Sequence, residues 1–315
     1  MRLRPKVRRV RKGKVIHMKF KALTVRNIKL FFKDKGMFFA SLITPMILLV
    51  LYVTFLGKTY DDSFRQSMPE GFVLPESVIG GLVGAELVSS ILAVCCVTVA
   101  FCSNMLMVQD KVSGSRVDFT VAPVKRFVLS MSYYAATVLS TLIVCFAALG
   151  ACLIYLKSAG WYMTAADILL MCGDTVLLVL FGTALSSIVN LFISTQGQIS
   201  AVGTIVSAGY GFICGAYMPI SNFGSGLRKV LSFLPGTYGT SLIRNHTMRG
   251  VFAEMADSGV PDEVLTGIKE AVDCRLYFFD NVVTIPVMAV WLAVSAAVLI
   301  AVYILLNVIK ERKSV

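Results

Sequence analysis

The chain has few charged residues for its length. Of its 315 residues, 15% are charged and 57% are hydrophobic, and the mean hydropathy is +0.77. An average soluble domain carries about 25% charged residues. With so little polar surface a soluble domain of this size could not cover itself, so the composition excludes an ordinary soluble protein.

The sequence also lacks the motifs of nucleotide and metal chemistry. No G-x-x-x-x-G-K-[ST] sequence occurs, so the phosphate-binding loop of many ATPases is absent. There are two histidines, His17 and His246, and no spacing typical of metal ligands. The apolar runs described below contain no histidine, which argues against a nucleophile–base pair inside the membrane. We therefore expect no catalytic residue, metal or cofactor in this chain.

The eight cysteines do not suggest a disulfide framework. Only Cys274 lies in a predicted outer loop, where no second cysteine could pair with it. The others lie inside apolar runs, where a thiol behaves as a small apolar group. These are Cys95, Cys96, Cys102, Cys145, Cys152, Cys172 and Cys214.

Long apolar runs dominate the sequence instead. About 20 helical residues cross the hydrocarbon core of a bilayer, and six runs approach or exceed that length. They lack the alternation of barrel strands, so the sequence predicts an all-α, polytopic membrane protein with six transmembrane helices. A four-residue link, 194–197, predicts a tight hairpin between the fourth and fifth runs. The runs cover residues 37–56, 80–108, 132–156, 166–193, 198–220 and 283–308.

Charge placement predicts the orientation of these helices. Residues 1–36 contain fourteen Lys and Arg against Asp34 alone, and the segments 109–131 and 309–315 are basic as well. Because basic loops stay on the cytoplasmic side, we expect both termini in the cytoplasm and the acidic 57–79 loop outside. A polybasic arm before a membrane helix more often meets anionic lipid than nucleic acid, so we expect no nucleic-acid partner.

The segments outside the six runs suggest a domain organisation. A basic extension, 1–17, precedes a basic amphipathic helix, 18–36, which we expect to lie in the membrane interface and to end at Gly36. The transmembrane domain covers 37–310, with a possible kink at Pro45, and a short tail covers 311–315. Within this domain, 109–131 is a cytoplasmic loop, interpreted either as a solvated connector or as a short exposed helix.

The outer segment before the last helix, 221–282, has two predicted parts. Residues 221–250 are broken by turn-forming stretches, including 235–238, which favours a re-entrant or interfacial hairpin buried against protein. Residues 251–282 are polar, and Pro261 followed by two acids is typical of a helix start. We expect this second part to form a small cap outside the membrane.

Three acids fall within the predicted membrane helices, where charge is costly. Glu86 and Asp167 lie near the outer ends of their helices, so we expect them to reach water. Asp174 lies one to two turns deeper and either pairs with a neighbouring helix or lines a polar cavity. In the fifth run, small residues suit close helix packing or a substrate-facing surface.

Along residues 18–310, the order of these features resembles that in the membrane subunit of a type-2 ATP-binding-cassette (ABC) exporter. The stretch RNIKLFFKDKG resembles that family's connecting helix, and 109–124 resembles its coupling loop. Residues 215–219 and 234–238 resemble the break after the fifth helix and the re-entrant helices. One departure is Pro235-Gly236-Thr237, where many relatives place an Asn-Pro pair.

The resemblance implies a function that the residues alone do not. It implies a bacterial plasma-membrane permease that pairs with a second permease copy or paralogue and with a cytoplasmic ABC ATPase, which binds the ATP and Mg. That ATPase would drive alternating access and export of a hydrophobic or amphipathic substrate, such as a drug, a lipid or a lipid-linked compound. The implied coupling-loop residues are Asp110, Lys111, Gly114, Asp118 and Pro123. The implied connecting-helix residues are Arg26, Asn27, Asp34 and Lys35. The candidate translocation path comprises Gly203, Ser207, Tyr210, Gly211 and Tyr217.

Two other classes remain open. An ATPase-independent secondary carrier or channel would more naturally carry inverted repeats, and the sequence has no convincing internal repeat. An intramembrane enzyme would need catalytic groups that the apolar runs lack.

Overall fold

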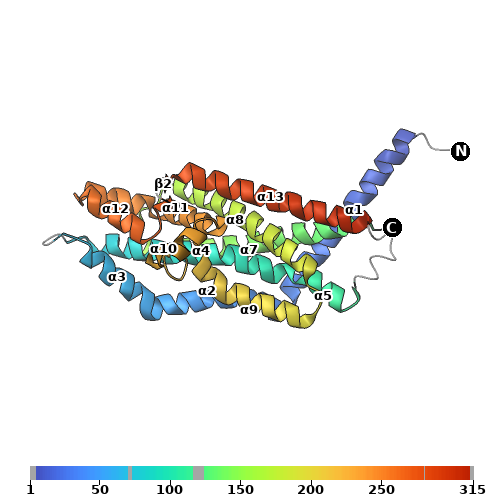
Figure 1. Cartoon of the computed structure of the whole chain (residues 1–315), viewed down its shortest axis with the longest axis horizontal. Coiled ribbons are helices and arrows are strands. Elements are labelled where there is room, and N and C mark those ends of the chain that lie inside the picture. Colours follow the sequence, from blue (N-terminus) through green and yellow to red (C-terminus); the bar gives the residue numbers. More distant parts are fainter. Residues whose placement is uncertain (1–4, 70–72, 116–123, 280, 313–315) are drawn as a thin grey trace.

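A computed structural model describes residues 5–69, 73–115, 124–279 and 281–312, and in these ranges the chain is almost wholly helical (Figure 1). A two-stranded antiparallel hairpin, in which Leu276 pairs with Val283, is the sheet in the described ranges. The elements are α1 (Pro5–Lys33), α2 (Lys35–Leu51), the π-helix η1 (Tyr52–Leu56), α3 (Gly57–Gln66), α4 (Glu76–Asn104), α5 (Leu106–Val112), α7 (Arg126–Ala159), α8 (Ala165–Phe192), α9 (Gln196–Ile213), the 3-10 helix η2 (Ile220–Asn222), α10 (Ser225–Leu231), α11 (Pro235–Asp257), α12 (Asp262–Ala271), β1 (Leu276–Phe278), β2 (Asn281–Val283) and α13 (Ile285–Arg312).

Five helical stretches in the described residues are long and apolar enough to cross a membrane. They are Lys35–Gln66, Glu76–Val112, Arg126–Ala159, Ala165–Phe192 and Ile285–Lys310. The all-α prediction is confirmed, but the fifth predicted run is not among these stretches. It forms α9, which ends at Ile213, before the predicted end at 220. The chain then turns through Gly215, whose φ of +77° suits a residue without a side chain.

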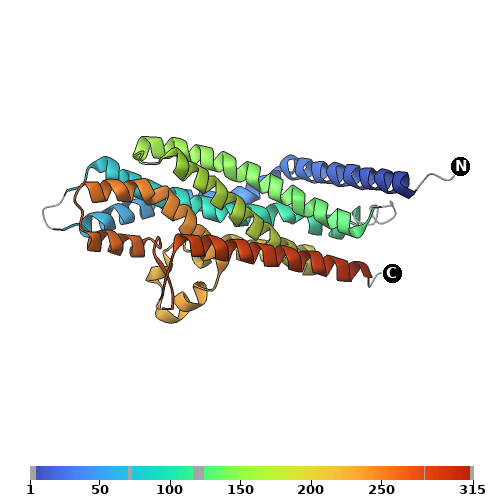
Figure 2. The same cartoon turned by 90° about the horizontal axis from the view of Figure 1, so that it is seen from above.

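The helix α4 forms the centre of the bundle (Figures 1 and 2). In its most apolar window 89% of residues are buried, against 22% to 50% in the other four stretches. Its contact with α8 is close: a Cβ added at Gly182 would lie 3.1 Å from the Cα of Val97. Small residues allow such backbone approach between membrane helices. The outer helices therefore bury one side on α4 and leave apolar side chains exposed on the other.

At one end of the bundle, α1 and α2 are separate helices. Asp34 lies between them, and its Oδ1 accepts a hydrogen bond from the Met37 amide at 3.0 Å, so it N-caps α2. The predicted break at Gly36 was therefore two residues too late. The buried residues Leu23, Asn27 and Phe31 of α1 repeat at helical spacing, as expected for an amphipathic helix. The helix α1 is continuous across residues 17 and 18, and Figure 1 shows its amino-terminal half extending beyond the bundle.

At the other end, residues 235–257 differ from the prediction of broken stretches. Pro235, expected in a turn, occupies the first turn of α11, where a missing N–H costs nothing. The resulting helix has 23 residues, most of them buried. The predicted helix start near Pro261 is confirmed, because α12 begins at Asp262. The segment before the last helix is thus dominated by one long buried helix.

A buried arginine on α11 joins the segments at this end. Arg244 is 0% exposed and lies 2.5 Å from Glu86 of α4, which is 1% exposed. The prediction that Glu86 reaches water was therefore wrong. Asp273 lies 3.7 Å from the same guanidinium, and burial raises the pKa of Asp273 to about 6 although the positive charge opposes this. Further guanidinium bonds go to Ser90 Oγ (3.0 Å), Gly215 O (3.1 Å) and Val272 O (2.8 Å).

Two more basic residues of α11 meet the acids of α8. His246 Nδ1 lies 2.5 Å from Asp174 Oδ2, and both side chains are buried. Arg249 Nε lies 2.6 Å from Asp167 Oδ1, on the side of α11 that faces solvent. Asp167 also caps α8 by accepting the Thr164 amide at 2.8 Å, so it is buried rather than reaching water as predicted. All three acids of the predicted membrane helices thus pair with one helix.

We expect Arg244→Met to destabilise the protein strongly. Removing one partner of a buried ion pair leaves an unpaired charge and costs about 3–5 kcal/mol. The double variant Glu86→Leu with Arg244→Met should recover part of this loss, because Glu86 is then not left without its partner, while Asp273 still loses the guanidinium. Thermal unfolding of the detergent-solubilised chain measures both effects. A matched control is Arg65→Gln, which removes exposed ion pairs to Asp61 at 2.8 Å and Glu76 at 2.6 Å and should cost far less, because water screens them. Equal losses for Arg244→Met and Arg65→Gln would contradict the assignment.

Candidate functional site

The predicted connecting helix and coupling loop meet at the end of the bundle where both termini lie (Figure 1). Arg26 of α1 forms a two-pronged contact with Asp110 of α5: Nη1 lies 2.6 Å from Oδ2 and Nη2 lies 3.2 Å from Oδ1. Tyr133 of α7 donates to the same carboxylate, and Asn27 Oδ1 accepts from Arg26 at 2.9 Å. The Asp110 carboxylate raises the pKa of Arg26 above its ordinary value. We call Arg26, Asn27, Asp110 and Tyr133 the α1–α5 clasp.

Lys111, the next residue of α5, holds the end of α8 instead. Its Nζ donates to the carbonyl oxygens of Asn190 (2.8 Å) and Ile193 (3.2 Å). Lys310 of α13 donates to the Leu191 carbonyl at 3.0 Å. The last carbonyls of a helix carry partial negative charge and have no intrahelical partner, so two lysines suit this position. The helices α5 and α13 are thereby tied to the same end of α8.

The remaining predicted residues of this end differ in their surroundings. Gly114 lies in an exposed turn after α5, with φ +79°, and Lys35 is exposed in the first turn of α2. Asp118 and Pro123 lie outside the described residues. Sequence reasoning found Arg26 and Asp110 through the resemblance, but it missed Tyr133. An aromatic residue at the start of an apolar run carries no signal that its hydroxyl binds a carboxylate.

The five residues of the candidate translocation path do not share one surface. Tyr217 folds back onto α9, so a Cβ added at Gly211 would lie 2.5 Å from its ring. The Tyr217 hydroxyl is 3.5 Å from the Ser207 carbonyl. Tyr210 is buried and faces the start of α11, since a Cβ at Gly236 would lie 2.8 Å from its hydroxyl. Gly203 faces Met105 at the far end of α9. The exposed apolar face of α9 comprises Ile205, Phe212 and Ile213.

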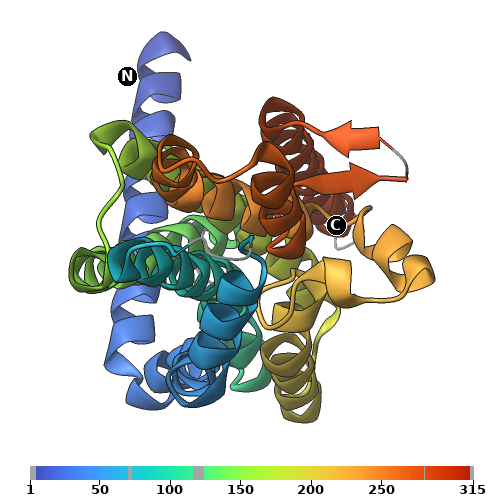
Figure 3. The same ribbon diagram turned by 90° about the vertical axis from the view of Figure 1, so that its left-hand side faces the viewer.

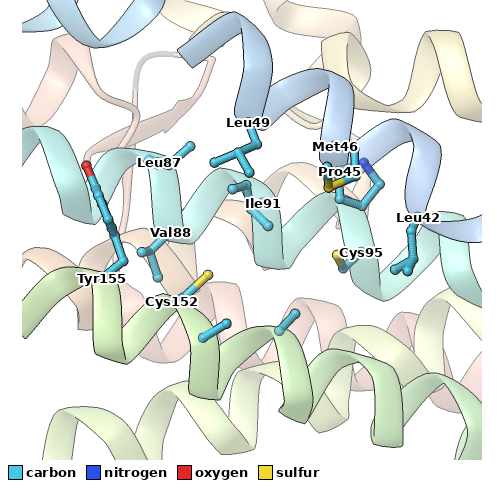
Figure 4. Close-up of a pocket in the computed structure, with 12 residues that line it drawn as sticks. Leu42, Pro45, Met46, Leu49, Leu87, Val88, Ile91, Cys95, Cys152 and Tyr155 are labelled. Carbon is cyan, nitrogen blue, oxygen red and sulfur yellow. The ribbon is translucent and has the colours of Figure 1, made fainter. Parts of the chain in front are cut away.

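An apolar groove lies between α2, α4 and α7, with a volume of about 420 Å³ (Figure 4). The helix α4 forms its floor, and α2 and α7 form its walls. No charged side chain lines it, and the Tyr155 hydroxyl and two thiols are its polar side-chain groups. Such a lining suits an apolar ligand and offers nothing to a sugar or an ion. Its residues are Leu42, Pro45, Met46, Leu49, Leu87, Val88, Ile91, Cys95, Ala148, Ala151, Cys152 and Tyr155.

The described residues contain no group of three or more His, Cys, Asp or Glu side chains that could hold a metal ion. The eight cysteines are free. Cys274, predicted to lie in an outer loop, is buried with its Sγ 3.6 Å from the Met248 sulfur.

Comparison with known proteins gives a family. The model of the ABC-2 type transporter family matches residues 18–247, which include α2 to α9, the α1–α5 clasp and the first half of α11. Neither the comparison with curated proteins nor the comparison with solved structures finds a match. The match covers well over half of the chain, and several apolar helices accompany it. The chain therefore belongs to the ABC-2 type transporter family, as the membrane-spanning permease subunit of an ABC-type transporter.

Proposed function

We propose that this permease exports a hydrophobic or amphipathic substrate by alternating access, driven by a separate cytoplasmic ATPase. The observation that carries the proposal is the α1–α5 clasp. It links the membrane-interface helix to α5, where the predicted coupling loop 109–131 begins, so a force applied to either one reaches the other. Through Lys111 the same loop is tied to α8. A rigid connection of this kind is what a motor protein outside the membrane would need.

The orientation follows from charge. The clasp end carries both termini, and residues 1–36 hold fourteen basic residues. We propose that this end lies in the cytoplasm of a bacterial cell and that α12 and the β-hairpin lie outside. Family membership implies an ABC ATPase as partner, and no phosphate-binding loop occurs in this chain. ATP and Mg would therefore be bound by that partner.

We propose α9 as the sixth membrane helix and α10 with α11 as a re-entrant segment. At about 1.5 Å per residue, the 18 residues of α9 extend about 27 Å, close to the thickness of the hydrocarbon core. In this proposal the segment from the end of α9 to the end of α11 enters and leaves the membrane on the same side. A second permease copy or paralogue would cover the exposed apolar faces of α9 and α2, including Ile205, Phe212 and Phe39.

The apolar groove supports the substrate class. It is deep enough that Val88 and Cys95 of its floor are almost fully buried, yet it opens between two membrane helices. An apolar cavity gives water too few polar partners, so a hydrocarbon chain is the more stable occupant. A drug, a lipid or the apolar part of a lipid-linked compound fits that description.

The alternative is a secondary carrier or channel that needs no ATPase. The observation in its favour is the buried Asp174–His246 pair, because titratable pairs inside membrane proteins often serve proton relays. In the proposed exporter this pair instead docks α11 on α8.

We expect Asp110→Arg to uncouple ATP hydrolysis from export while the chain still inserts. The new positive charge would repel Arg26. A loss of about 1.4 kcal/mol of interaction free energy already corresponds to a tenfold change in an equilibrium constant. The swapped pair, Arg26→Asp with Asp110→Arg, should restore export in part. The measurement is substrate-stimulated hydrolysis by the ATPase that copurifies with the chain from its host. The swap Asp61→Arg with Arg65→Asp, at the other end, is the control. Normal export in Asp110→Arg, or a chain that purifies without any ATPase, would remove the coupling role.

The alternative function is tested at Asp174. In the exporter, Asp174→Asn should lower the thermal stability, since the buried contact between Asp174 Oδ2 and His246 Nδ1 is weakened, but should leave ATP-driven transport in vesicles intact. Transport that needs a proton gradient and disappears in Asp174→Asn would favour the carrier. Asp257→Asn, near the exposed end of α11, provides a control.

We expect Ala148→Trp to fill the groove and reduce export. The indole would occupy space between α2 and α4, so an apolar substrate could no longer enter, whereas basal ATP hydrolysis should remain. Leu139→Trp, on the exposed side of the same helix, adds the same side chain away from the groove. Export measured in vesicles should fall in the first variant only. Equal export in both variants would exclude the groove from the substrate path.

A further inference from the structure

A hollow with two positive charges lies at the end of the bundle that carries α12 and the β-hairpin. It has a volume of about 310 Å³ and is lined by Arg228 and Lys229 of α10, Ser232, and Tyr277 and Phe279 of the hairpin. Figure 3 shows α10 and the hairpin side by side at the edge of the bundle. We call this the cationic hollow.

Its positive charges have no acidic partner among residues 5–69, 73–115, 124–279 and 281–312. Among the described residues, no Asp or Glu lies within salt-bridge distance of Arg228 or Lys229. The Lys229 ammonium lies 5.8 Å from the centre of the Phe279 ring. Glu270, which accepts a hydrogen bond from Tyr277, is 3.7 Å from Arg275 and is compensated there. The hollow therefore favours an anion.

A second hollow, with an apolar lining, adjoins it. Its volume is about 250 Å³, and it lies between the hairpin and the first two turns of α13. Because α13 is one of the five candidate membrane helices, this apolar hollow lies at the edge of the hydrocarbon region. Its lining comprises Tyr238, Phe278, Asn281, Val282, Val283, Val287 and Trp291.

Only a layer of aromatic rings separates the two hollows. The Phe278 and Phe279 rings line one hollow each, and their centres are 5.0 Å apart. Phe233 packs edge-on against both, at 5.0 and 5.9 Å. Tyr238, from the apolar hollow, donates its hydroxyl hydrogen bond at 2.5 Å to the carbonyl of Ser232, from the cationic hollow. A ligand with a charged head and an apolar chain can therefore contact both hollows at once.

We propose that these hollows form a binding site for an anionic lipid of the outer membrane leaflet. The phosphate of its headgroup lies between Arg228 and Lys229, and one acyl chain lies in the apolar hollow against Val287 and Trp291. The placement agrees with this assignment: Tyr277 and Phe279, which line the cationic hollow, come just before α13, whereas Trp291 of the apolar hollow lies in its second turn, and Trp and Tyr favour the membrane interface. The inference needs α13 to cross the membrane and rests on the proposed orientation, which puts this end outside, but it does not depend on the direction or the substrate of transport.

The test compares lipids that share acyl chains and differ in headgroup. The full-length chain in detergent is titrated with short-chain phosphatidylglycerol or phosphatidylcholine, and with glycerol phosphate alone, while its thermal midpoint is followed. We expect the anionic lipid to stabilise the chain at the lowest concentration. The double variant Arg228→Gln with Lys229→Gln should weaken this effect about tenfold or more, since each basic residue adds to the attraction of an anionic headgroup.

Two further variants separate the two parts of the site. Val287→Trp fills the apolar hollow and should weaken the stabilisation by phosphatidylglycerol, while Arg228 and Lys229 stay intact. Lys58→Gln with Lys157→Gln removes the same charge from exposed positions of other helices and should change nothing. Equal stabilisation by phosphatidylglycerol and phosphatidylcholine would overturn recognition of the headgroup charge. Equal stabilisation by glycerol phosphate and phosphatidylglycerol would overturn binding of an acyl chain in the apolar hollow. A basic-pair variant that responds like the wild type would overturn the proposal as a whole.

Discussion

The fold depends on α11, a helix whose basic side chains meet acids of the surrounding apolar bundle. Arg244, His246 and Arg249 occupy less than two turns of α11, and each meets an acid from α4 or α8. Of the three, Arg244 is a fully buried charge, and such a charge without a partner costs several kcal/mol, so its contact with Glu86 holds α11 in place against α4. Arg244 adds hydrogen bonds to the chain after α9 and after α12. One side chain thereby fixes the route of the segment between α9 and α13.

A second charge pair occupies the opposite end of the same central rod. Glu86 lies near the beginning of α4, and Asp110 lies in α5, which continues the same membrane-crossing stretch. In a regular helix these residues are about 36 Å apart. Each carboxylate binds an arginine from elsewhere in the chain, Arg244 at one end and Arg26 at the other. Between these two pairs, Asn104 of α4 donates hydrogen bonds to the Ser186 and Ser187 hydroxyls of α8 at 3.0 and 2.8 Å, so the rod is also held to α8 along its length.

The sequence predicted the apolar helices, the amphipathic stripe of α1 and the start of α12, because hydropathy and local capping signals decide those features. It did not predict the contacts of α11. Local patterns made 221–250 look broken, since Pro235 and Gly236 are turn residues as well as helix-starting residues. The partners are also remote: His246 lies 72 positions from Asp174, and Arg244 lies 154 positions from Ser90. No periodicity connects such residues. Arg26 and Asp110 were found only because their surroundings resemble a family.

The pairing of Glu86 with Arg244 has a consequence for the biosynthesis of the chain. Ribosomes add about 5–20 residues per second, so the helix with Glu86 is complete roughly 8–30 seconds before Arg244 is made. During that interval the carboxylate has no arginine to meet, and the early helices must wait in an incomplete arrangement at the translocon. The lysine that caps α8 from α13, Lys310, is made later still. The two ends of the membrane domain can therefore close at different times: the α1–α5 clasp needs no residue beyond Tyr133, whereas the Glu86–Arg244 pair and the Lys310 contact need most of the chain to be translated.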